Sequence, residues 1–350
     1  MSYSDWAIAP YDGDLDWELI NENPSFSNRI DHALVSFDNK LWVLGGYDQG
    51  ARDHDPYMED VWASSDGVIW TCITEDAPWK GRRGHEVIIF KDEMYLIGGF
   101  AVDEDSGIRN YQNDVWKTID GENWSEVTAE ASWPARFKHQ VVQANHGGTD
   151  YLYLLTGMGM NEEGYGQYAV VYYNDVWRST DGETWTEMTS SQDIGQRSTA
   201  AAFVNPESNR LYIVGGLYLV IFDDGADSSY DGKPSANWDK MWYTDDGSTW
   251  NYTGFGTSTR ADNQIEYYED RFWVLPGRSN SIAHINYNSG PEYYSTYTYN
   301  GSSWTKDSES SGVGARYGYA AAVHNNKLWV IGGRTADDGP DNDVWAGELQ

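Results

Sequence analysis

Six arginines with equivalent surroundings are the first residues in this sequence whose type and spacing could support chemistry. Each begins a segment that runs through an apolar stretch and a polar turn to a pair of small residues, usually Gly-Gly. A guanidinium at such a repeated position can bind an acidic ligand through its fork of N–H donors, or it can be held by a carboxylate of the protein itself. The six are Arg29, Arg82, Arg136, Arg197, Arg260 and Arg316.

Carboxylates also recur at a fixed place, so the arginines have candidate partners within the chain. Asp60, Asp114, Asp175 and Asp343 each precede a Val-Trp pair. Because a feature shared by the units of a repeat protein is usually architectural, the sequence favours Arg–Asp forks that tie neighbouring units together. A collar of arginines that faces an acidic ligand in a central channel stays open as the alternative.

Aromatic side chains interleaved with carboxylates and amides form a second group with binding potential. They fall in the long segments after each small-residue pair and in the connections that lead into the arginines. Flat rings stack on the C–H faces of sugars, and Asp, Asn and Gln bridge sugar hydroxyls. We expect a ligand site on this face, at Tyr47, Tyr111, Tyr168, Tyr173, Tyr230, Trp238, Tyr287, Trp79 and Trp133. The alternative is that the long loops fold over one another and bury their own aromatics.

Two metal-binding patterns occur, and neither is complete. His32, His85 and His139 each stand three residues after an arginine, but Ala, Asn and Tyr hold this place in the other three repeats. Acidic clusters suggest calcium, yet the first of them lacks the Glu that ends a calcium-binding loop, because Asn23 stands at the twelfth position counted from Asp12. We therefore expect no cofactor and solvated acidic loops, with calcium kept as the alternative. The calcium candidates are Asp223, Asp224, Asp227, Asp337 and Asp341.

Catalytic patterns are sparse. A sugar mutarotase or epimerase needs only an acid and a base near the arginines, and Glu266 and Asp262 are the carboxylates close to Arg260. A sialidase-like hydrolase would also need a Tyr-Glu nucleophile pair, for which the sequence offers no recognisable candidate. An enzyme that acts on an anionic sugar at the arginine collar is therefore the alternative to a binding protein.

A twelve-residue unit must position all of these side chains. Residues 174–185 read N-D-V-W-R-S-T-D-G-E-T-W, in which Val-Trp begins one strand, Asp-Gly suits a two-residue hairpin turn, and Thr-Trp begins a second strand. Copies occupy residues 60–70, 114–124, 240–250 and 295–304, and the last copy is split between residues 342–345 and 12–17. With the inner hairpin that follows each arginine, every repeat carries four strands.

The spacing of the repeats predicts a ring. The second Trp of each copy falls at residue 17, 70, 124, 185, 250 or 304, so the chain contains six units of four antiparallel strands, the pattern of a six-bladed β-propeller. An open ring would leave unpaired strand edges in water. We expect a single all-β propeller domain over residues 1–350, in which a strand at about residues 14–20 completes the blade formed by residues 316–349.

The repeats resemble those of the kelch family, in its bacterial type with Asp-box-like turns. The matching features are the Gly pairs, the R-x-x-H sequences that begin at Arg29, Arg82 and Arg136, and the Trp that follows each Asp. The S-x-D-G-x-x-W turns are similar to Asp-box turns shortened by one residue. The resemblance covers essentially the whole chain and implies a propeller. In some kelch propellers the Arg at this place contacts an acidic ligand.

Composition limits the partners that we expect. The 55 acidic and 23 basic residues give a formal net charge of −32, which repels nucleic acid and anionic membrane surfaces. No apolar run is long enough to span a membrane, and the first residues lack the pattern of a signal peptide. The charge favours an extracellular or cell-surface location, and a cytoplasmic one stays open.

These features predict a non-enzymatic recognition or adhesion propeller, which binds a glycan or a protein surface through long loops on one face. Two alternatives stay open, namely the mutarotase or epimerase at the arginine collar and an architectural module of a surface assembly or fibre. The identity of the ligand lies in loop conformations that spacing does not reveal.

Overall fold

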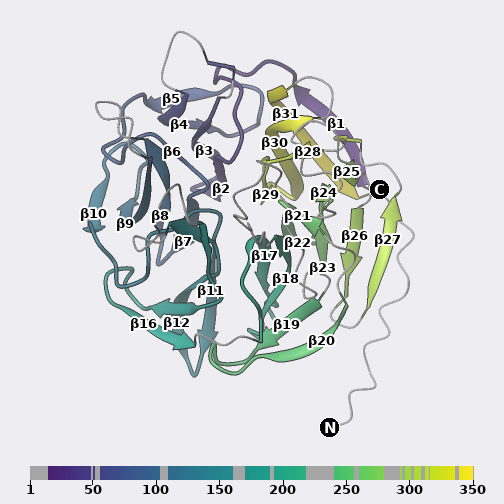
Figure 1. Cartoon of the computed structure of the whole chain (residues 1–350). Coiled ribbons are helices and arrows are strands. Elements are labelled where there is room, and N and C mark those ends of the chain that lie inside the picture. Colours follow the sequence, from purple (N-terminus) through teal and green to yellow (C-terminus); the bar gives the residue numbers. More distant parts are fainter. Residues whose placement is uncertain are drawn as a thin grey trace, which may run out of the picture.

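The computed structural model describes residues 15–48, 50–51, 56–102, 109–160, 170–189, 193–217, 240–255, 260–279, 292–293, 296–300, 303–308, 312–314, 316–335 and 339–349. Every regular element in these segments is a β-strand, and the strands form six blades around a central axis (Figure 1). The same segments hold no helix that is long and apolar enough to cross a membrane. The predicted all-β, six-bladed propeller is confirmed.

Blades 1 to 3 follow one another along the chain, each ordered from the axis outward. Blade 1 consists of β2 (Ala33–Phe37), β3 (Lys40–Tyr47), β4 (Tyr57–Ser64) and β5 (Thr71–Thr74). Blade 2 consists of β7 (Glu86–Phe90), β8 (Glu93–Val102), β9 (Arg109–Thr118) and β10 (Ser125–Thr128). Blade 3 consists of β11 (Gln140–His146), β12 (Thr149–Leu155), β15 (Val176–Ser179) and β16 (Trp185–Thr189).

Blades 4 and 5 keep the same order. Blade 4 consists of β17 (Ser198–Val204), β18 (Leu211–Leu217), β19 (Lys240–Thr244) and β20 (Asn251–Phe255). Blade 5 consists of β22 (Ile265–Tyr268), β23 (Arg271–Val274), β26 (Thr296–Tyr299) and β27 (Trp304–Ser308). Short strands lie in the connections: β6 (Arg82–Arg83), β13 (Met158–Met160), β14 (Val170–Tyr172), β21 (Arg260–Ala261), β24 (Gly277–Ser279), β25 (Glu292–Tyr293) and β28 (Arg316–Tyr317).

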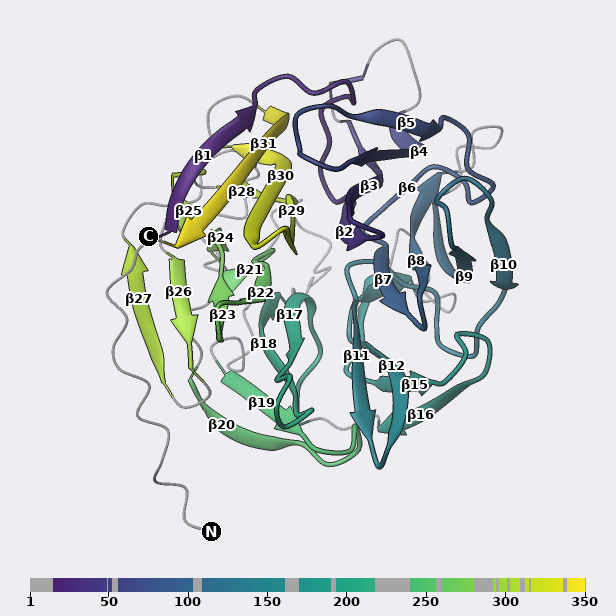
Figure 2. The same ribbon diagram turned by 180° about the vertical axis from the view of Figure 1, so that it is seen from behind.

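Blade 6 is built from both ends of the chain. It consists of β29 (Ala320–His324), β30 (Lys327–Thr335) and β31 (Gly339–Leu349), with β1 (Leu15–Asn21) as its outer strand. The strands β1 and β31 are antiparallel, from the pair Leu15 and Leu349 to the pair Asn21 and Val344, and they lie side by side in Figure 2. The predicted closure of the ring is therefore confirmed, because β1 covers a strand edge that would otherwise face water.

The two kinds of hairpin turn differ from the prediction. In blade 4 the inner turn spans residues 205–210, between the paired residues Val204 and Leu211. The other five inner hairpins contain two-residue turns in which both central residues have positive φ, as at Asp38 (47°) and Asn39 (56°). The outer hairpins do not, because Ser179 pairs with Trp185 and leaves residues 180–184 in the turn. There Asp181 accepts hydrogen bonds from the backbone N–H groups of Glu183 and Thr184, so the Asp-Gly pair belongs to an Asp-box-like turn.

Apolar clusters between adjacent blades form the core. Between blades 1 and 2, for example, Trp42, Leu44 and Val61 pack with Leu96 and the fully buried Trp79. The outer turns reach into these clusters, because a Cβ added to Gly121 (φ 75°) would overlap the Trp42 ring of the preceding blade. Each turn therefore anchors its blade to the neighbour as well as closing its own hairpin.

Candidate functional site

Four arginines are buried and held by aspartates of their own blades. Arg82, 2% exposed, donates hydrogen bonds to both carboxylate oxygens of Asp114 at 2.7 and 2.8 Å. Arg29 bonds Asp60, Arg136 bonds Asp175 and Arg316 bonds Asp343 in the same bidentate way. The interpretation as carboxylate forks is confirmed for these four.

The forks also connect neighbouring blades. The backbone N–H of Arg136 donates to the Gln112 carbonyl of blade 2, and the Arg136 carbonyl accepts from Gly99 of the same blade. The guanidinium meanwhile holds Asp175 of blade 3, and this carboxylate also accepts a hydrogen bond from the Trp177 indole at 2.8 Å. The Arg–Asp–Trp relay is therefore an interblade clamp whose charge is already neutralised.

Blade 4 departs from this pattern. Lys240 stands where the other blades have the aspartate, and the indole N–H of Trp242 is buried without a hydrogen bond. Arg197 is 1% exposed and donates to the carbonyls of Gly215 and Ile194, and its burial lowers its pKa to about 10. In blade 5 the backbone of Arg260 pairs with Ser279.

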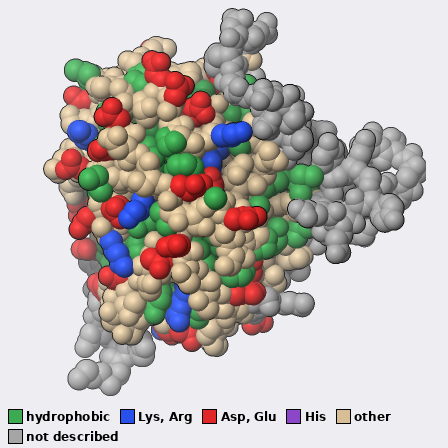
Figure 3. Space-filling view, turned by 90° about the vertical axis from the view of Figure 1, so that its left-hand side faces the viewer, with side chains coloured by type: hydrophobic (Ala, Val, Ile, Leu, Met, Phe, Trp, Pro, Cys, Tyr) green, Lys and Arg blue, Asp and Glu red, His purple; other side chains and the backbone are tan. Residues whose placement is uncertain are grey.

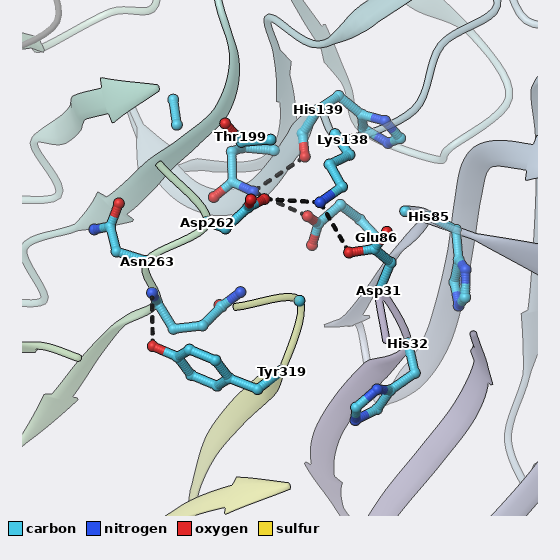
Figure 4. Close-up of a pocket in the computed structure, with 15 residues that line it drawn as sticks. Asp31, His32, His85, Glu86, Lys138, His139, Thr199, Asp262, Asn263 and Tyr319 are labelled. Atoms are coloured by element: carbon cyan, nitrogen blue, oxygen red, sulfur yellow. Dashed lines mark hydrogen bonds and ion pairs between the residues drawn. The ribbon is translucent and has the colours of Figure 1, made fainter. Parts of the chain in front are cut away.

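Residues that follow the arginines, rather than the guanidiniums themselves, line the hollow on the axis. This hollow has a volume of about 70 Å³, and its walls come from positions two to four residues after each arginine (Figure 4). The alternative of an arginine collar around a central channel is therefore wrong for the four forked arginines, because their guanidiniums turn into the blades to reach their aspartates. The hollow lies among Asp31, Lys138, Glu86 and Tyr319.

A ring of backbone hydrogen bonds surrounds the axis. The residue two positions after each arginine has positive φ, from 51° to 64°, and this holds for Asp31, Gly84, Lys138, Thr199, Asp262 and Gly318. In five of the six steps its N–H donates to the carbonyl of the equivalent residue in the preceding blade, at 2.7 to 3.2 Å. The left-handed backbone conformation points these N–H and C=O groups toward the neighbouring blades, so hydrogen bonds link consecutive blades around the axis.

An ion triad crosses the axis at this level. The Nζ of Lys138 lies 2.8 Å from the Asp31 carboxylate and 2.7 Å from the Asp262 carboxylate, which joins blades 1, 3 and 5 (Figure 4). The intervening blades carry Gly84, Thr199 and Gly318, and a Cβ on Gly318 would lie 2.9 Å from the Asp31 carboxylate. Because side chains converge near the axis, long residues alternate with short ones. Asp262, an expected acid or base, is therefore an ion-pair partner.

The three histidines are packed between blades as neutral groups. Burial is the main cause that lowers the pKa of His85 and His139 to about 3, and it also lowers that of His32. The His85 ring lies against Gly45 of the preceding blade, where an added Cβ would be 2.8 Å from its Cε1 atom. No cluster of three metal-ligating side chains occurs among the described residues.

Two half-buried glutamates in the inner strands have raised pKa values. Burial raises the pKa of Glu86 and of Glu266 to about 8. The Glu86 carboxyl accepts a hydrogen bond from the Gln140 amide at 3.0 Å, beside the ion triad. Near neutral pH these groups are therefore mostly uncharged acids, the protonation state that a proton donor requires.

An aromatic cluster lies on the loop face, which we define as the face that carries the connections between the second and third strands of the blades. Tyr47 contacts Tyr57 at 4.9 Å, Tyr57 contacts Phe100 at 5.6 Å, and Phe100 contacts Tyr111 at 5.3 Å and Phe137 at 5.6 Å between ring centroids. The three Tyr side chains are half-buried, whereas Phe100 and Phe137 are buried. The cluster spans blades 1 to 3.

Arg83 completes this cluster. Its guanidinium lies 4.7 Å from the Tyr47 ring and 5.7 Å from the Phe100 ring, and its Nη1 lies 3.8 Å from Asp31. Tyr47 and Tyr111 were expected on this face from the sequence, whereas Arg83, Phe100 and Phe137 were not. The one sequence signal for Arg83 and Phe137 is that each directly follows a repeated arginine, a position whose side chain lies beside the central axis on the loop face.

Two expected ligand residues belong to the core instead. Trp79 and Trp133 are 0% exposed, and they contact Trp124 and Trp185 edge-on at 5.7 and 6.1 Å. The prediction that Trp79 and Trp133 line a ligand site is therefore wrong, because the connections before the arginines turn inward between the blades. Tyr173 is half-buried, and its ring lies 4.1 Å from the Arg136 guanidinium.

Other expected site residues fall outside the described segments. They are Tyr168, Tyr230, Trp238, Tyr287, Asp223, Asp224, Asp227 and Asp337. Asp341 is described, and its carboxylate accepts hydrogen bonds from the backbone N–H groups of Asn342 and Asp343.

Comparisons with known proteins agree with this geometry. A family model described as the KLHDC2/KLHL20/DRC7 Kelch-repeats domain matches residues 13–216, more than half of the 350 residues, and one described as the Kelch motif matches residues 315–346. No curated protein matches the chain. A solved structure titled "Structure of YjhT" has a TM-score of 0.69 and 16% identity, over 95% of this chain and all of that chain, which shows a shared fold. The chain belongs to the kelch-repeat family.

Proposed function

We propose that this kelch propeller is a non-enzymatic recognition module that binds a glycan through the aromatic cluster on its loop face. The observation that carries the proposal is the continuous cluster that brings the half-buried rings of Tyr47, Tyr57 and Tyr111 together at the loop ends of blades 1 and 2. Such rings stack on sugar C–H faces. The exposed amide of Asn110, beside Tyr111, adds a donor and an acceptor for sugar hydroxyls.

The axis supports recognition rather than catalysis. Four of the six repeated arginines are neutralised by Asp, and Lys138 is held between Asp31 and Asp262. The hollow of about 70 Å³ is also smaller than the roughly 300 Å³ or more of an ordinary small-molecule site. A module of this kind with a net charge of −32 would suit an extracellular or cell-surface location.

A glycan array probed with the full chain tests this function, with and without calcium. We expect selective binding that falls about tenfold or more in Tyr111→Ala, the loss expected for one aromatic contact. Tyr252→Ala is the matched control, because Tyr252 is 46% exposed on the outer strand β20 of blade 4. Equal losses in both variants, or no glycan bound by the parent chain, would reject the proposal. In the second case, self-assembly in light scattering would favour an architectural module, and capture of a protein partner would favour a protein ligand.

A mutarotase or epimerase is the second candidate, and one observation favours it. The raised pKa values of Glu86 and Glu266, about 8, provide acids at neutral pH, of which Glu86 lines the hollow on the axis and Glu266 lies on the inner strand β22. Proton NMR of freshly dissolved sugar anomers, neutral and anionic, would reveal faster interconversion that is lost in Glu266→Gln. An unchanged rate with the parent chain would exclude this activity for the sugars tested.

A further inference from the structure

We propose that the glycan bound by the aromatic cluster is an uncharged one, without carboxylate, sulfate or phosphate groups. This inference rests on the proposed function and narrows the class of ligand at the same site. It depends on which charges the loop face leaves available to a ligand.

The forked arginines offer no charge to an acidic sugar. Arg29, Arg82 and Arg136 begin the three blades beneath the cluster and are 0 to 2% exposed. Each gives its two terminal nitrogens to one aspartate, and one of these nitrogens also donates to a backbone carbonyl such as that of Gly98. A sugar carboxylate would have to break a buried bidentate pair to reach them, which would leave an aspartate charge uncompensated.

Arg83 is the cation within the cluster, and aromatic rings and an acid already surround it. Its side chain is 26% exposed, its guanidinium lies over Tyr47 and Phe100, and its Nη1 faces Asp31. Lys138, with 14% of its side chain exposed, bridges Asp31 and Asp262. Asp31 and Asp262 therefore balance the charge of both cations. An incoming anion would compete with Asp31 for Arg83 and with two close ion pairs for Lys138.

The charge of the whole molecule acts in the same direction. Acidic side chains are spread over the side of the ring shown in Figure 3, with Lys and Arg at scattered positions among them. The net charge of −32 slows the approach of an anionic glycan and opposes its binding. An uncharged glycan avoids this repulsion and needs only ring stacking and amide hydrogen bonds, which Tyr111 and Asn110 can supply.

The test uses an array of neutral oligosaccharides, each printed beside its sialylated and sulfated forms, and the full chain with Arg83→Met as a second probe. We expect the affinity for each neutral form to be at least about tenfold higher than the affinity for its acidic forms. Because Arg83 belongs to the cluster, Arg83→Met is judged by the ratio of the two affinities, and we expect the preference for neutral over acidic forms to stay within about threefold of that of the parent chain. Affinity for the neutral forms should change little between low and high salt.

The outcomes separate the inference from the proposed function. Tighter binding of acidic forms, lost in Arg83→Met and weakened by salt, would overturn the inference and leave glycan recognition in place. Neutral binding that is insensitive to Tyr111→Ala would place the glycan elsewhere and overturn both. The absence of any bound oligosaccharide would also overturn both.

Discussion

Two sets of blades hold the repeated arginine in different ways. The first set is blades 1, 2, 3 and 6, and the second is blades 4 and 5. The first set keeps the complete Arg–Asp–Trp relay, as in Arg82, Asp114 and Trp116. Blade 4 has Lys240 in place of the aspartate, and the corresponding residue of blade 5 is Ser295. The ring therefore keeps its fold with four complete relays, and the relay is a stabilising device rather than a requirement of each blade.

The contact between consecutive blades shows how such changes are tolerated. Where the Gly pair begins with Gly98, the His139 ring of the next blade fills the space above it. Where blade 3 has Thr156 instead of this Gly, blade 4 has Ala200 instead of the His. Where blade 5 has Pro276, blade 6 has Tyr319, whose hydroxyl donates to the Pro276 carbonyl. At these two interfaces, divergence in the repeat is therefore paired across neighbouring blades, whereas blade 4 keeps Gly215 although blade 5 has Asn263 in place of the His.

Deleting residues 1–21 should have the largest effect, because it removes the outer strand of blade 6, a blade with a complete relay. Leu15, Trp17 and Ile20 pack partly against the adjoining clusters, so we expect a loss of about 5 kcal/mol and a Tm lower by about 10 °C. Differential scanning calorimetry measures this. A truncated chain that melts like the parent would show that the pairing of β1 with β31 does not stabilise the ring.

Breaking one relay should cost somewhat less. Asp114→Ala leaves the Arg82 guanidinium buried without its carboxylate, and we expect a loss of about 3 to 5 kcal/mol. Lys240→Ala is the matched change in blade 4, where the side chain is half-buried, and it should cost less than about 1 kcal/mol. Urea unfolding of both variants gives the two values. Similar losses would remove the distinction between the two sets of blades.

A double-mutant cycle tests the contact between Gly98 of blade 2 and His139 of blade 3. Gly98→Thr should clash with His139, whose Cε1 lies 3.0 Å from the new Cβ, and cost about 2 kcal/mol. His139→Ala should recover at least about 1 kcal/mol of this loss, since the pair then copies Thr156 and Ala200. Thr156→Gly, with no ring opposite, should change stability by less than about 1 kcal/mol. Additive losses in the cycle would contradict paired divergence.

The pH dependence should give the smallest change in the free energy of unfolding, when the change over one pH unit is compared with the losses above. His85 and His139 have pKa values of about 3 when folded, so the unfolded chain binds more protons below about pH 6.5 and stability falls as the pH is lowered. Glu86 and Glu266 have pKa values of about 8, so only the unfolded chain ionises them above about pH 4.5, and stability falls as the pH rises toward 8.

Thermal unfolding between pH 4 and 9 would measure both limbs. His139→Asn should flatten the acid limb, and Glu86→Gln the alkaline limb, by up to about 1.4 kcal/mol for each pH unit of its window. Blade 4 already has Ala200 at the histidine position, so it adds nothing to the acid limb. Unchanged limbs in both variants would show that these buried groups do not govern the pH profile.

The sequence alone determined the architecture because the repeat is written in local patterns. Alternating strands, turn residues and six Trp residues that recur every 53 to 65 residues predict blades, and the split copy predicts β1 beside β31. The Arg–Asp forks could also be predicted, since both partners recur at fixed positions in one blade. The length of the outer turn was missed because the side chain of Asp181 bonds backbone groups that an ordinary hairpin would pair.

Only the tertiary structure decided which side chains meet across the ring. Lys138 reaches Asp31 and Asp262 from blades that are distant in sequence, and Arg83 joins Tyr47 and Phe100, because the ring brings equivalent positions together at the axis. Trp79 and Trp133 are in the core because the connections before the arginines fold inward. Periodicity fixes the strands within a blade, whereas contacts between blades depend on how six sheets pack around a common centre, which no local pattern encodes.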